Sequence, residues 1–307
     1  MVCFFAYMSE TTIHYSSCPV CDSTNIVAAL HAKDYTVSHN EYEIMHCNNC
    51  TVRFTQDVPD MQNIGSYYKS EEYVSHTDTQ KGFINKLYHI IRERTLKKKV
   101  QIISKATGMQ KGSLLDLGAG VGAFAAQAKR KGWSVTALEP DADARNVAKE
   151  KFGIEAHPSH ELFQLPGNSF DAITMWHVLE HVHQLHEYVE AFKKILKSSG
   201  ALIIAVPNYT SFDAQKYGQY WAAYDVPRHL YHFSLESMKK LMLQHGLEVK
   251  EMLPMVYDSY YVSMLSEKYK RGYNSYTDAF LTGLKSNIST GKEAEKYSSV
   301  IYIIKKI

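Results

Sequence analysis

Residues 114–122 read Leu-Leu-Asp-Leu-Gly-Ala-Gly-Val-Gly, an apolar run that passes directly into a glycine-rich turn. The leucines predict a buried strand. The alternating glycines let the backbone turn tightly and approach a ligand closely, because glycine has no Cβ. Residues 123–131 then have the pattern of a helix, whose first N–H groups and dipole would face that ligand. The segment therefore predicts a strand, a turn and a helix that together bind a nucleoside cofactor.

Two cofactors fit these glycines. From Gly118 onward the spacing satisfies the dinucleotide pattern G-x-G-x-x-[GA]. With Asp116 in front it also satisfies the D-x-G-x-G-x-G pattern of class I S-adenosylmethionine methyltransferases. Glu139 ends the next apolar segment, about 20 residues further on, and its carboxylate would hold a ribose diol in either cofactor. The glycines alone thus leave an NAD-dependent oxidoreductase and a methyltransferase open.

Two later segments favour the methyltransferase. Residues 170–182, FDAITMWHVLEHV, and residues 196–208, LKSSGALIIAVPN, resemble the fourth and fifth strands of class I methyltransferases. The resemblance covers roughly residues 83–253. It implies S-adenosylmethionine as cofactor and an α/β fold with a doubly wound, mostly parallel seven-stranded sheet, the Rossmann-like methyltransferase fold. A non-catalytic cofactor-binding protein with the same fold is the second hypothesis.

Four of the five cysteines form two C-x-x-C pairs: Cys18, Cys21, Cys47 and Cys50. Two such pairs bring four thiolates to one tetrahedral centre, which suits zinc. Four thiolates leave no open coordination position, so we expect a structural zinc in a small, zinc-ribbon-like N-terminal module. Disulfides are the alternative, and they are disfavoured in a cytoplasmic chain. Cys3 is left over as a free thiol.

Charge and hydropathy limit the partners. The 307 residues carry a net charge of +2, so no global basic field would hold a nucleic acid. No apolar run approaches the roughly 18–20 residues of a membrane helix, and the apolar N-terminus lacks the basic leader of a secretory signal. We expect a cytoplasmic protein with a small-molecule acceptor, no nucleic-acid partner and no membrane insertion. A homo-oligomer stays open.

The patterns divide the chain into four parts. These are a zinc-binding module at 13–56, a linker and N-terminal helical region at 57–110, a methyltransferase core at 111–253 with a lid at 208–234, and an aromatic insertion with a final strand at 254–307. The strands of the core are expected near 113–117, 133–138, 154–156, 170–175, 201–206, 247–253 and 300–305, and one long helix at 179–197. Residues 254–298 are rich in tyrosine and suit either a lid or a dimer arm.

The resemblance places the cofactor at the turn and at the neighbouring strand ends. The residues expected to bind it are Asp116, Gly118, Ala119, Gly120, Gly122, Glu139, Pro140, Trp176 and His177. The acid that usually selects adenine after the third strand is missing, because residues 157–163 read His-Pro-Ser-His-Glu-Leu-Phe. Methyl transfer also needs a base for the acceptor proton, and histidine is suited by its near-neutral pKa. The candidates are His181, His229 and His232.

The last two histidines lie in residues 224–233, a segment expected to line the acceptor pocket. The segment resembles the "RHlyhF" signature of a methyltransferase subgroup and the "EHlsYf" segment of zinc-containing sugar C-methyltransferases. A sugar nucleotide or related glycan precursor is therefore the first acceptor expected, and a quinone or phenol the second. Arg228 could pair with a phosphate or carboxylate of the acceptor.

One further run has the spacing of a metal-binding signature. Residues 177–181 read His-Val-Leu-Glu-His, formally the H-x-x-E-H of inverted zinc peptidases. That site needs both histidines on one face of a helix. Because the run follows directly on a buried strand within a methyltransferase-like order, we do not expect a peptidase.

Overall fold

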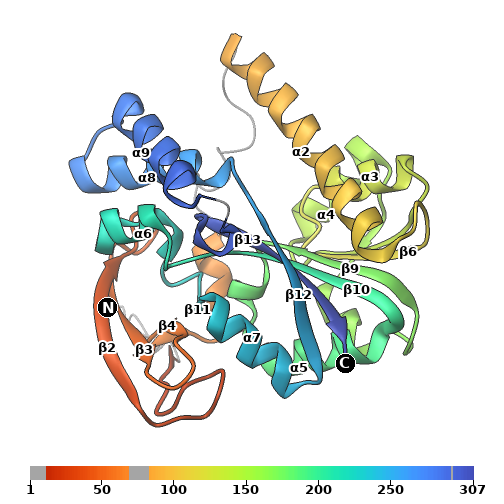
Figure 1. Cartoon of the computed structure of the whole chain (residues 1–307), viewed down its shortest axis with the longest axis horizontal. Coiled ribbons are helices and arrows are strands. Elements are labelled where there is room, and N and C mark those ends of the chain that lie inside the picture. The colour runs from red at the N-terminus through yellow and green to blue at the C-terminus, as the bar shows by residue number, and fades with distance from the viewer. Residues whose placement is uncertain (1–11, 69–82, 292) are drawn as a thin grey trace, which may run out of the picture.

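The computed structural model describes residues 12–68, 83–291 and 293–307, and the side chains of 83–91 are not part of the description. Cys3 therefore lies outside the described residues. Figure 1 shows a central sheet with helices above and below it, and a smaller sheet at its side. Within the described part of the chain, no helix is both long and apolar enough to cross a membrane.

The central sheet has seven strands in the order β12-β13-β10-β9-β6-β7-β8. The first five along the chain, β6 to β10, run parallel, and β13 is antiparallel to both of its neighbours. This confirms the predicted Rossmann-like methyltransferase fold. The strands are β6 (Ser113–Leu117), β7 (Ser134–Leu138), β8 (Ala156–His157), β9 (Phe170–Trp176), β10 (Leu196–Pro207), β12 (Leu247–Pro254) and β13 (Ser299–Lys306).

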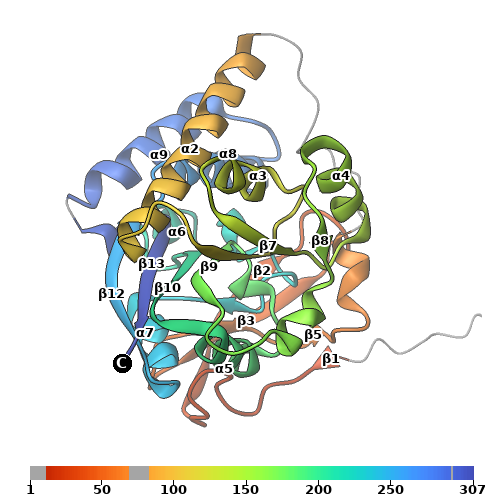
Figure 2. The ribbon, with the colours of Figure 1, turned by 90° about the vertical axis from the view of Figure 1, so that its right-hand side faces the viewer.

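Helices cover both faces of this sheet, as Figures 1 and 2 show. The helices α2 (Phe83–Thr107), α3 (Ala123–Arg130) and α4 (Ala142–Phe152) lie on one face, and α5 (Leu185–Ile195) and α7 (Leu235–Gln244) lie on the other. Strand β6 shows why both faces are buried. Leu114 packs in the cluster with α2 and α3, whereas Leu115 and Leu117 pack in the cluster with α5 and α7. Alternate side chains of a strand point to opposite faces.

The prediction of one long helix at 179–197 is wrong for its first residues. Residues Leu179–His181 form only a 3-10 turn, η3, and α5 begins at Leu185. The backbone carbonyl of Glu180 accepts from the N–H of Leu230 over 2.8 Å, so it is engaged outside any helical ladder. The H-x-x-E-H run therefore lies off any α-helix, and it lacks the geometry of the peptidase signature.

The small sheet joins two distant parts of the chain. Strands β2 (Ile26–Lys33), β3 (Glu41–Cys47) and β4 (Arg53–Thr55) are antiparallel, and β11 (Tyr231–His232) adds to β4 as a fourth strand. The short strands β1 (Thr12–Ile13) and β5 (Val58–Pro59) pair beside it. The segment just before α7 thus completes the sheet that starts in the cysteine module.

The aromatic stretch after β12 is helical. It forms α8 (Asp258–Arg271) and α9 (Tyr276–Ser289), which pack on each other and on α6 (Phe212–Tyr217). Figure 1 shows the three helices together at one end of the molecule, above the small sheet. Tyr217 of α6 donates to Glu267 of α8 over 3.0 Å. Four tyrosines of this stretch are exposed to solvent: Tyr257, Tyr261, Tyr273 and Tyr276.

Candidate cofactor and acceptor site

The glycine turn follows β6 and is tied to the next strand. The N–H groups of Gly118 and Ala119 both donate to Leu138 O, over 2.8 and 3.0 Å. Gly118 has φ +70°, and a Cβ there would lie 2.3 Å from Cγ2 of Val178. At Gly120, with φ +52°, a Cβ would meet nothing within 4 Å. Only glycine suits position 118, because its φ is positive and Val178 leaves no room for a Cβ. Position 120 faces open space.

Glu139 meets this turn from the end of β7. Its carboxylate accepts from Gly120 N over 2.7 Å and from Asp141 N over 3.0 Å, and the residue is 8% exposed. Burial raises the pKa of Glu139. Pro140 follows, and Arg145 donates to the carbonyls of both residues over 2.7 Å. A carboxylate held at the open side of a glycine turn can accept from the hydroxyls of a ribose.

Behind the turn lies a buried carboxyl with a half-buried lysine nearby. Asp116 is 1% exposed and accepts from Thr174 Oγ1 over 2.9 Å, and burial raises the pKa of Asp116 to about 7. Lys99 reaches in from α2, with Nζ 4.3 Å from the ring centroid of Trp176. Burial lowers the pKa of Lys99 to about 8, against the attraction of Asp258 and Asp116. Lys99 is not among the residues that the sequence predicts at the cofactor site.

His177 connects the end of β9 to helix α8. Its φ is +59°, which is unusual for a residue with a side chain. Nε2 lies 2.9 Å from Asp258 Oδ2, and Nδ1 lies 3.3 Å from Glu180 Oε1. Burial acts to lower the pKa of His177, but the hydrogen bonds with Asp258 and Glu180 outweigh it and raise that pKa to about 10. Its predicted contact with the cofactor stays a prediction, since both ring nitrogens bind carboxylates.

Two of the three candidate bases come together. The rings of His181, from η3, and His229 are 4.5 Å apart between centroids, with an interplanar angle of 77°. His181 Nδ1 lies 2.9 Å from Arg228 O and 3.0 Å from the hydroxyl of Tyr68. Burial, together with the neighbouring His229, lowers the pKa of His181 to about 4. At neutral pH the His181 imidazole is therefore uncharged and has a lone pair.

The third candidate base, His232, lies apart in β11. Its Nε2 is 3.1 Å from Thr55 Oγ1 on β4, and its ring meets Tyr224 edge-on at 4.9 Å. Burial lowers the pKa of His232 well below its ordinary value. These contacts join the small sheet to the 208–234 segment, and a catalytic role for His232 stays a prediction.

Arg228 is turned inward rather than toward an acceptor. Its guanidinium is 1% exposed, forms two hydrogen bonds with Asp225 at 3.0 and 2.5 Å, and donates to Tyr67 O over 3.2 Å. A bidentate internal ion pair of this kind fixes the loop that carries His229. The suggestion that Arg228 binds an acceptor phosphate is not favoured by this geometry.

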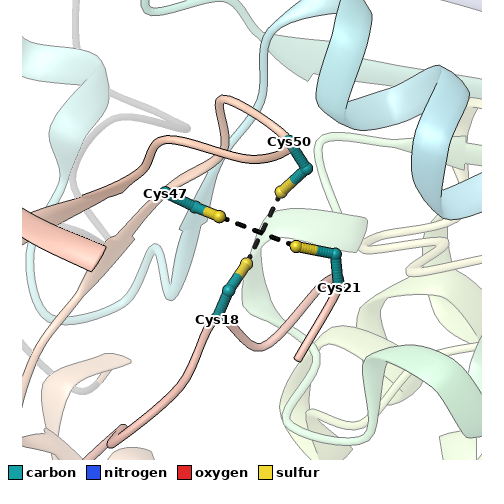
Figure 3. Close-up of side chains that lie close together, drawn as sticks. All are labelled: Cys18, Cys21, Cys47 and Cys50. Carbon is teal, nitrogen blue, oxygen red and sulfur yellow. Dashed lines mark hydrogen bonds between the residues drawn. The ribbon is translucent and has the colours of Figure 1, made fainter. Parts of the chain in front are cut away.

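The four cysteines converge on one point, as Figure 3 shows. Cys18 and Cys21 come from one loop, and Cys47 and Cys50 from the end of β3 and the turn after it. The Sγ atoms lie 3.5 Å apart for Cys18–Cys50 and 3.6 Å apart for Cys21–Cys47. A tetrahedral zinc with Zn–S bonds of about 2.3 Å would place its sulfurs about 3.8 Å apart. No disulfide joins these cysteines, and the four thiols fit a zinc ion.

Comparison with known proteins agrees with the fold. A family model described as a methyltransferase domain matches residues 88–252. The ubiquinone biosynthesis O-methyltransferase of Schizosaccharomyces pombe, a mitochondrial protein, is 27% identical over 41% of this chain, and the match spans 49% of its own length. The ubiquinone biosynthesis O-methyltransferase of Rickettsia prowazekii is 24% identical over 61% of this chain and 79% of its own.

Solved structures share the architecture over most of the chain. One of them is the geranyl diphosphate C-methyltransferase of Streptomyces coelicolor, with a TM-score of 0.51 and 15% identity over 75% of this chain and 88% of that one. At this identity the likeness shows the fold alone.

Proposed function

This chain belongs to the methyltransferase-domain family, and we propose that it transfers a methyl group from S-adenosylmethionine to a small-molecule acceptor. The observation that carries the proposal is the open glycine turn. Gly120 faces empty space beside the Glu139 carboxylate, at the same strand edge where His181 and His229 meet. Ligands of open α/β sheets bind at this edge, at the carboxyl ends of the strands.

For the cofactor we propose the residues expected from the sequence, with Lys99 added and with His177, whose ring nitrogens bind carboxylates, left as a prediction. The methionine half of the cofactor would contact the backbone of Gly118, Ala119, Gly120 and Gly122. Glu139 would bind the ribose, and Pro140 and Trp176 would line the adenine side. Asp116 would orient the turn. Lys99 would pair with the cofactor carboxylate, because its ammonium is held beside Trp176 next to the turn. Burial makes such a charge pair stronger than it is in water.

The bound cofactor supplies an electrophilic methyl group on a sulfonium. The chain's own task is then to align the acceptor with that methyl and to take up the acceptor proton. We propose His229 and His181 for the second task, since both lie at the acceptor side and Glu180 is buried beneath them. His232 would fix the loop that carries His229 through its contact with Thr55 of β4.

For the acceptor we propose a hydroxyl of a phenolic or quinone-type molecule, and a sugar nucleotide or glycan precursor as the alternative. The first is supported by the two relatives whose names are O-methyltransferases and by the inward-turned Arg228, which pairs with Asp225. The second is supported by the resemblance of residues 224–233 and the cysteine module to sugar C-methyltransferases. The net charge of +2 favours either over a nucleic acid.

We also propose that the four cysteines bind one structural zinc ion, supported by their sulfur spacing and burial. The zinc would fix the 13–56 module, whose strand β4 holds β11. From the sequence patterns we also propose three further parts of the chain: residues 57–110, residues 111–253 with a lid at 208–234, and residues 254–307. The cytoplasmic location and the oligomeric state stay predictions from the sequence.

Ligand affinity tests the cofactor assignment. Calorimetric titration should show S-adenosylhomocysteine binding far more tightly than NADH, and Glu139→Ala should weaken it by about 100-fold, because two hydrogen bonds to a charged group are lost. Glu248→Ala, at a half-exposed carboxylate on the edge strand β12, is the matched control and should leave the affinity unchanged. Tighter binding of NADH would overturn the proposal in favour of an oxidoreductase.

Turnover separates an enzyme from a cofactor-binding protein. With a phenolic acceptor, His229→Ala should lower the rate of methyl transfer by 10²–10⁴-fold, the usual contribution of general acid–base catalysis, while leaving S-adenosylhomocysteine affinity unchanged. If no phenolic, quinone or sugar-nucleotide acceptor is turned over by the unaltered protein, the binding-protein hypothesis is favoured instead.

A further inference from the structure

We infer that Glu180, His181 and His229 form a binding site for a divalent transition-metal ion on the acceptor side of the cofactor turn. One potential ligand atom from each residue lies within 4.8 Å of the other two. Two histidines and one carboxylate are a ligand set that suits Mn²⁺, Fe²⁺, Co²⁺ or Zn²⁺. The site is separate from the four-cysteine cluster, and it rests on the proposed function only for the role given to the metal.

The hydrogen bonds of the two histidines orient them as metal ligands. His181 Nδ1 lies 2.9 Å from Arg228 O, and His229 Nδ1 lies 2.9 Å from Ala223 O. A carbonyl oxygen can only accept, so each Nδ1 carries the proton and donates it. Each Nε2 is then the unprotonated nitrogen and has a lone pair, and that of His229 lies 3.8 Å from Asp225 Oδ2, beyond hydrogen-bond distance. Metal-binding histidines almost always donate their other ring N–H in this way, which fixes the tautomer and the ring.

Glu180 supplies an independent observation. It is 0% exposed, and its Oε2 has no hydrogen-bond partner among the described residues. Its other oxygen, Oε1, lies 3.3 Å from His177 Nδ1. A buried carboxylate oxygen without a partner loses its solvation and gains nothing in return, which is costly. A metal ion next to Oε2 would satisfy it, and His177 would then support the ligand from behind.

The three ligand atoms need to move only slightly closer together to bind one metal ion. Ligand atoms around one metal ion, at bond lengths of about 2.1 Å, lie about 3.0–3.4 Å from one another. Rotation of side chains can bring atoms within 4.8 Å of each other to that spacing. Three protein ligands leave at least one coordination position open. Val178, which packs against Gly118, is two residues before Glu180, so the site adjoins the cofactor turn.

The open position gives the metal a role in the proposed reaction. With the metal bound, His181 and His229 would act as its ligands and no longer as the bases proposed above. An acceptor hydroxyl oxygen would bind the cation, and its proton would pass to solvent, because a bound cation strongly favours the deprotonated oxygen. The oxygen would then attack the methyl carbon in line with the bond to sulfur. A C–O bond forms, the S–C bond breaks with its electron pair moving to sulfur, and uncharged S-adenosylhomocysteine leaves. An acceptor with two adjacent hydroxyls would bind such a cation best, as a chelate.

Metal content of matched variants tests the inference. The full-length protein, dialysed against a Mn²⁺ salt and then against buffer, should retain one metal ion per chain beyond the zinc of the cysteine cluster. Glu180→Gln and His229→Gln should each remove that second ion, or weaken Mn²⁺ binding at least tenfold. His245→Gln is the control, because His245 and His186 form a second histidine pair, 2.8 Å apart, with Glu190 nearby.

Binding of S-adenosylhomocysteine is measured on every variant to show that it is folded. Equal metal content in the unaltered protein and in folded Glu180→Gln would overturn the metal site. So would methyl transfer at an unchanged rate in a protein that holds only the cysteine-bound zinc, and His229 would then act as a base without a metal. Those outcomes leave the proposed function standing, whereas absence of S-adenosylhomocysteine binding would remove it whatever the metal content.

Discussion

The cofactor half of the site is made by adjacent strand ends, whereas the acceptor half is assembled from distant segments. The glycine turn and Glu139 end neighbouring strands β6 and β7, and one hydrogen bond joins them directly. On the acceptor side, His181 contacts Tyr68 from 113 residues away and the carbonyl of Arg228 from 47 residues away. The same side is held by β4 of the small sheet through Thr55.

The two halves therefore depend on the rest of the molecule to different degrees. The polar contacts of the cofactor half lie within the central sheet and helix α2, and the cysteine module meets them only through the apolar cluster that it shares with Leu115 and Leu117. We therefore expect the cofactor half to survive damage to the cysteine module. The acceptor half is fixed by three parts that must all be in place: η3, the loop before β11, and strand β4. Changes in the module should therefore affect transfer and leave cofactor affinity alone.

The largest effect is expected for Cys47→Ser. It removes one of four thiolates, and structural zinc contributes roughly 10–16 kcal/mol in isolated zinc-finger peptides. We expect loss of the zinc by elemental analysis, and fast amide hydrogen exchange in β11 with slow exchange kept in β6 and β9. Cys3→Ser should keep the zinc. Exchange that rises equally in both sheets would show that the two halves are not independent.

Gly118→Ala is expected to damage the cofactor half of the site. The added Cβ would lie 2.3 Å from Val178 Cγ2 at a φ of +70°, and such overpacking with backbone strain costs about 2–4 kcal/mol. We expect S-adenosylhomocysteine affinity to fall about 100-fold, with the zinc retained. Gly153→Ala is the matched control, because φ is +63° there and the space is open. Unchanged affinity in Gly118→Ala would place the cofactor elsewhere.

Thr55→Val tests the link between the module and the acceptor half. Its hydroxyl donates to His229 O over 2.7 Å and lies 3.1 Å from His232 Nε2, and the residue is fully buried. Loss of these contacts should lower stability to denaturant by about 1–3 kcal/mol and lower methyl transfer with no change in cofactor affinity. Thr107→Val, at the end of α2, is the control. Weakened cofactor affinity in Thr55→Val would show that the cofactor half also depends on the small sheet.

The smallest effect concerns pH. The pKa of His177 is raised to about 10 in the folded chain, above its unfolded value of about 6.5. Its contribution to stability is therefore complete below pH 6.5 and is lost as pH rises toward 10. The side chain is 34% exposed, so solvent weakens the ion pairs. Thermal unfolding at pH 6 and pH 9.5 should show a smaller pH effect in His177→Gln than in the unaltered chain, and equal effects would contradict this.

The sequence predicted what short-range patterns encode. Glycine spacing located the turn, and the two C-x-x-C pairs located a cluster that the structure confirms as four converging thiols. It did not predict Asp258 or Tyr68, because their partners His177 and His181 are 81 and 113 residues away. Lys99 carried a usable signal, since Ile102 and Ile103, three and four residues on, are buried. The broken helix at 179–184 depends on a tertiary hydrogen bond to Leu230, which no local pattern shows.

Methyl transfer to a small molecule is best measured with isotope-labelled S-adenosylmethionine in an extract of small metabolites, protein and RNA, separated by size and polarity. We predict label in small molecules, in the phenolic and quinone fraction first and in the sugar-nucleotide fraction as the alternative. The labelling should disappear with Gly118→Ala and with His229→Ala. Label that enters only protein or RNA, or no label in any fraction, would contradict a small-molecule methyltransferase.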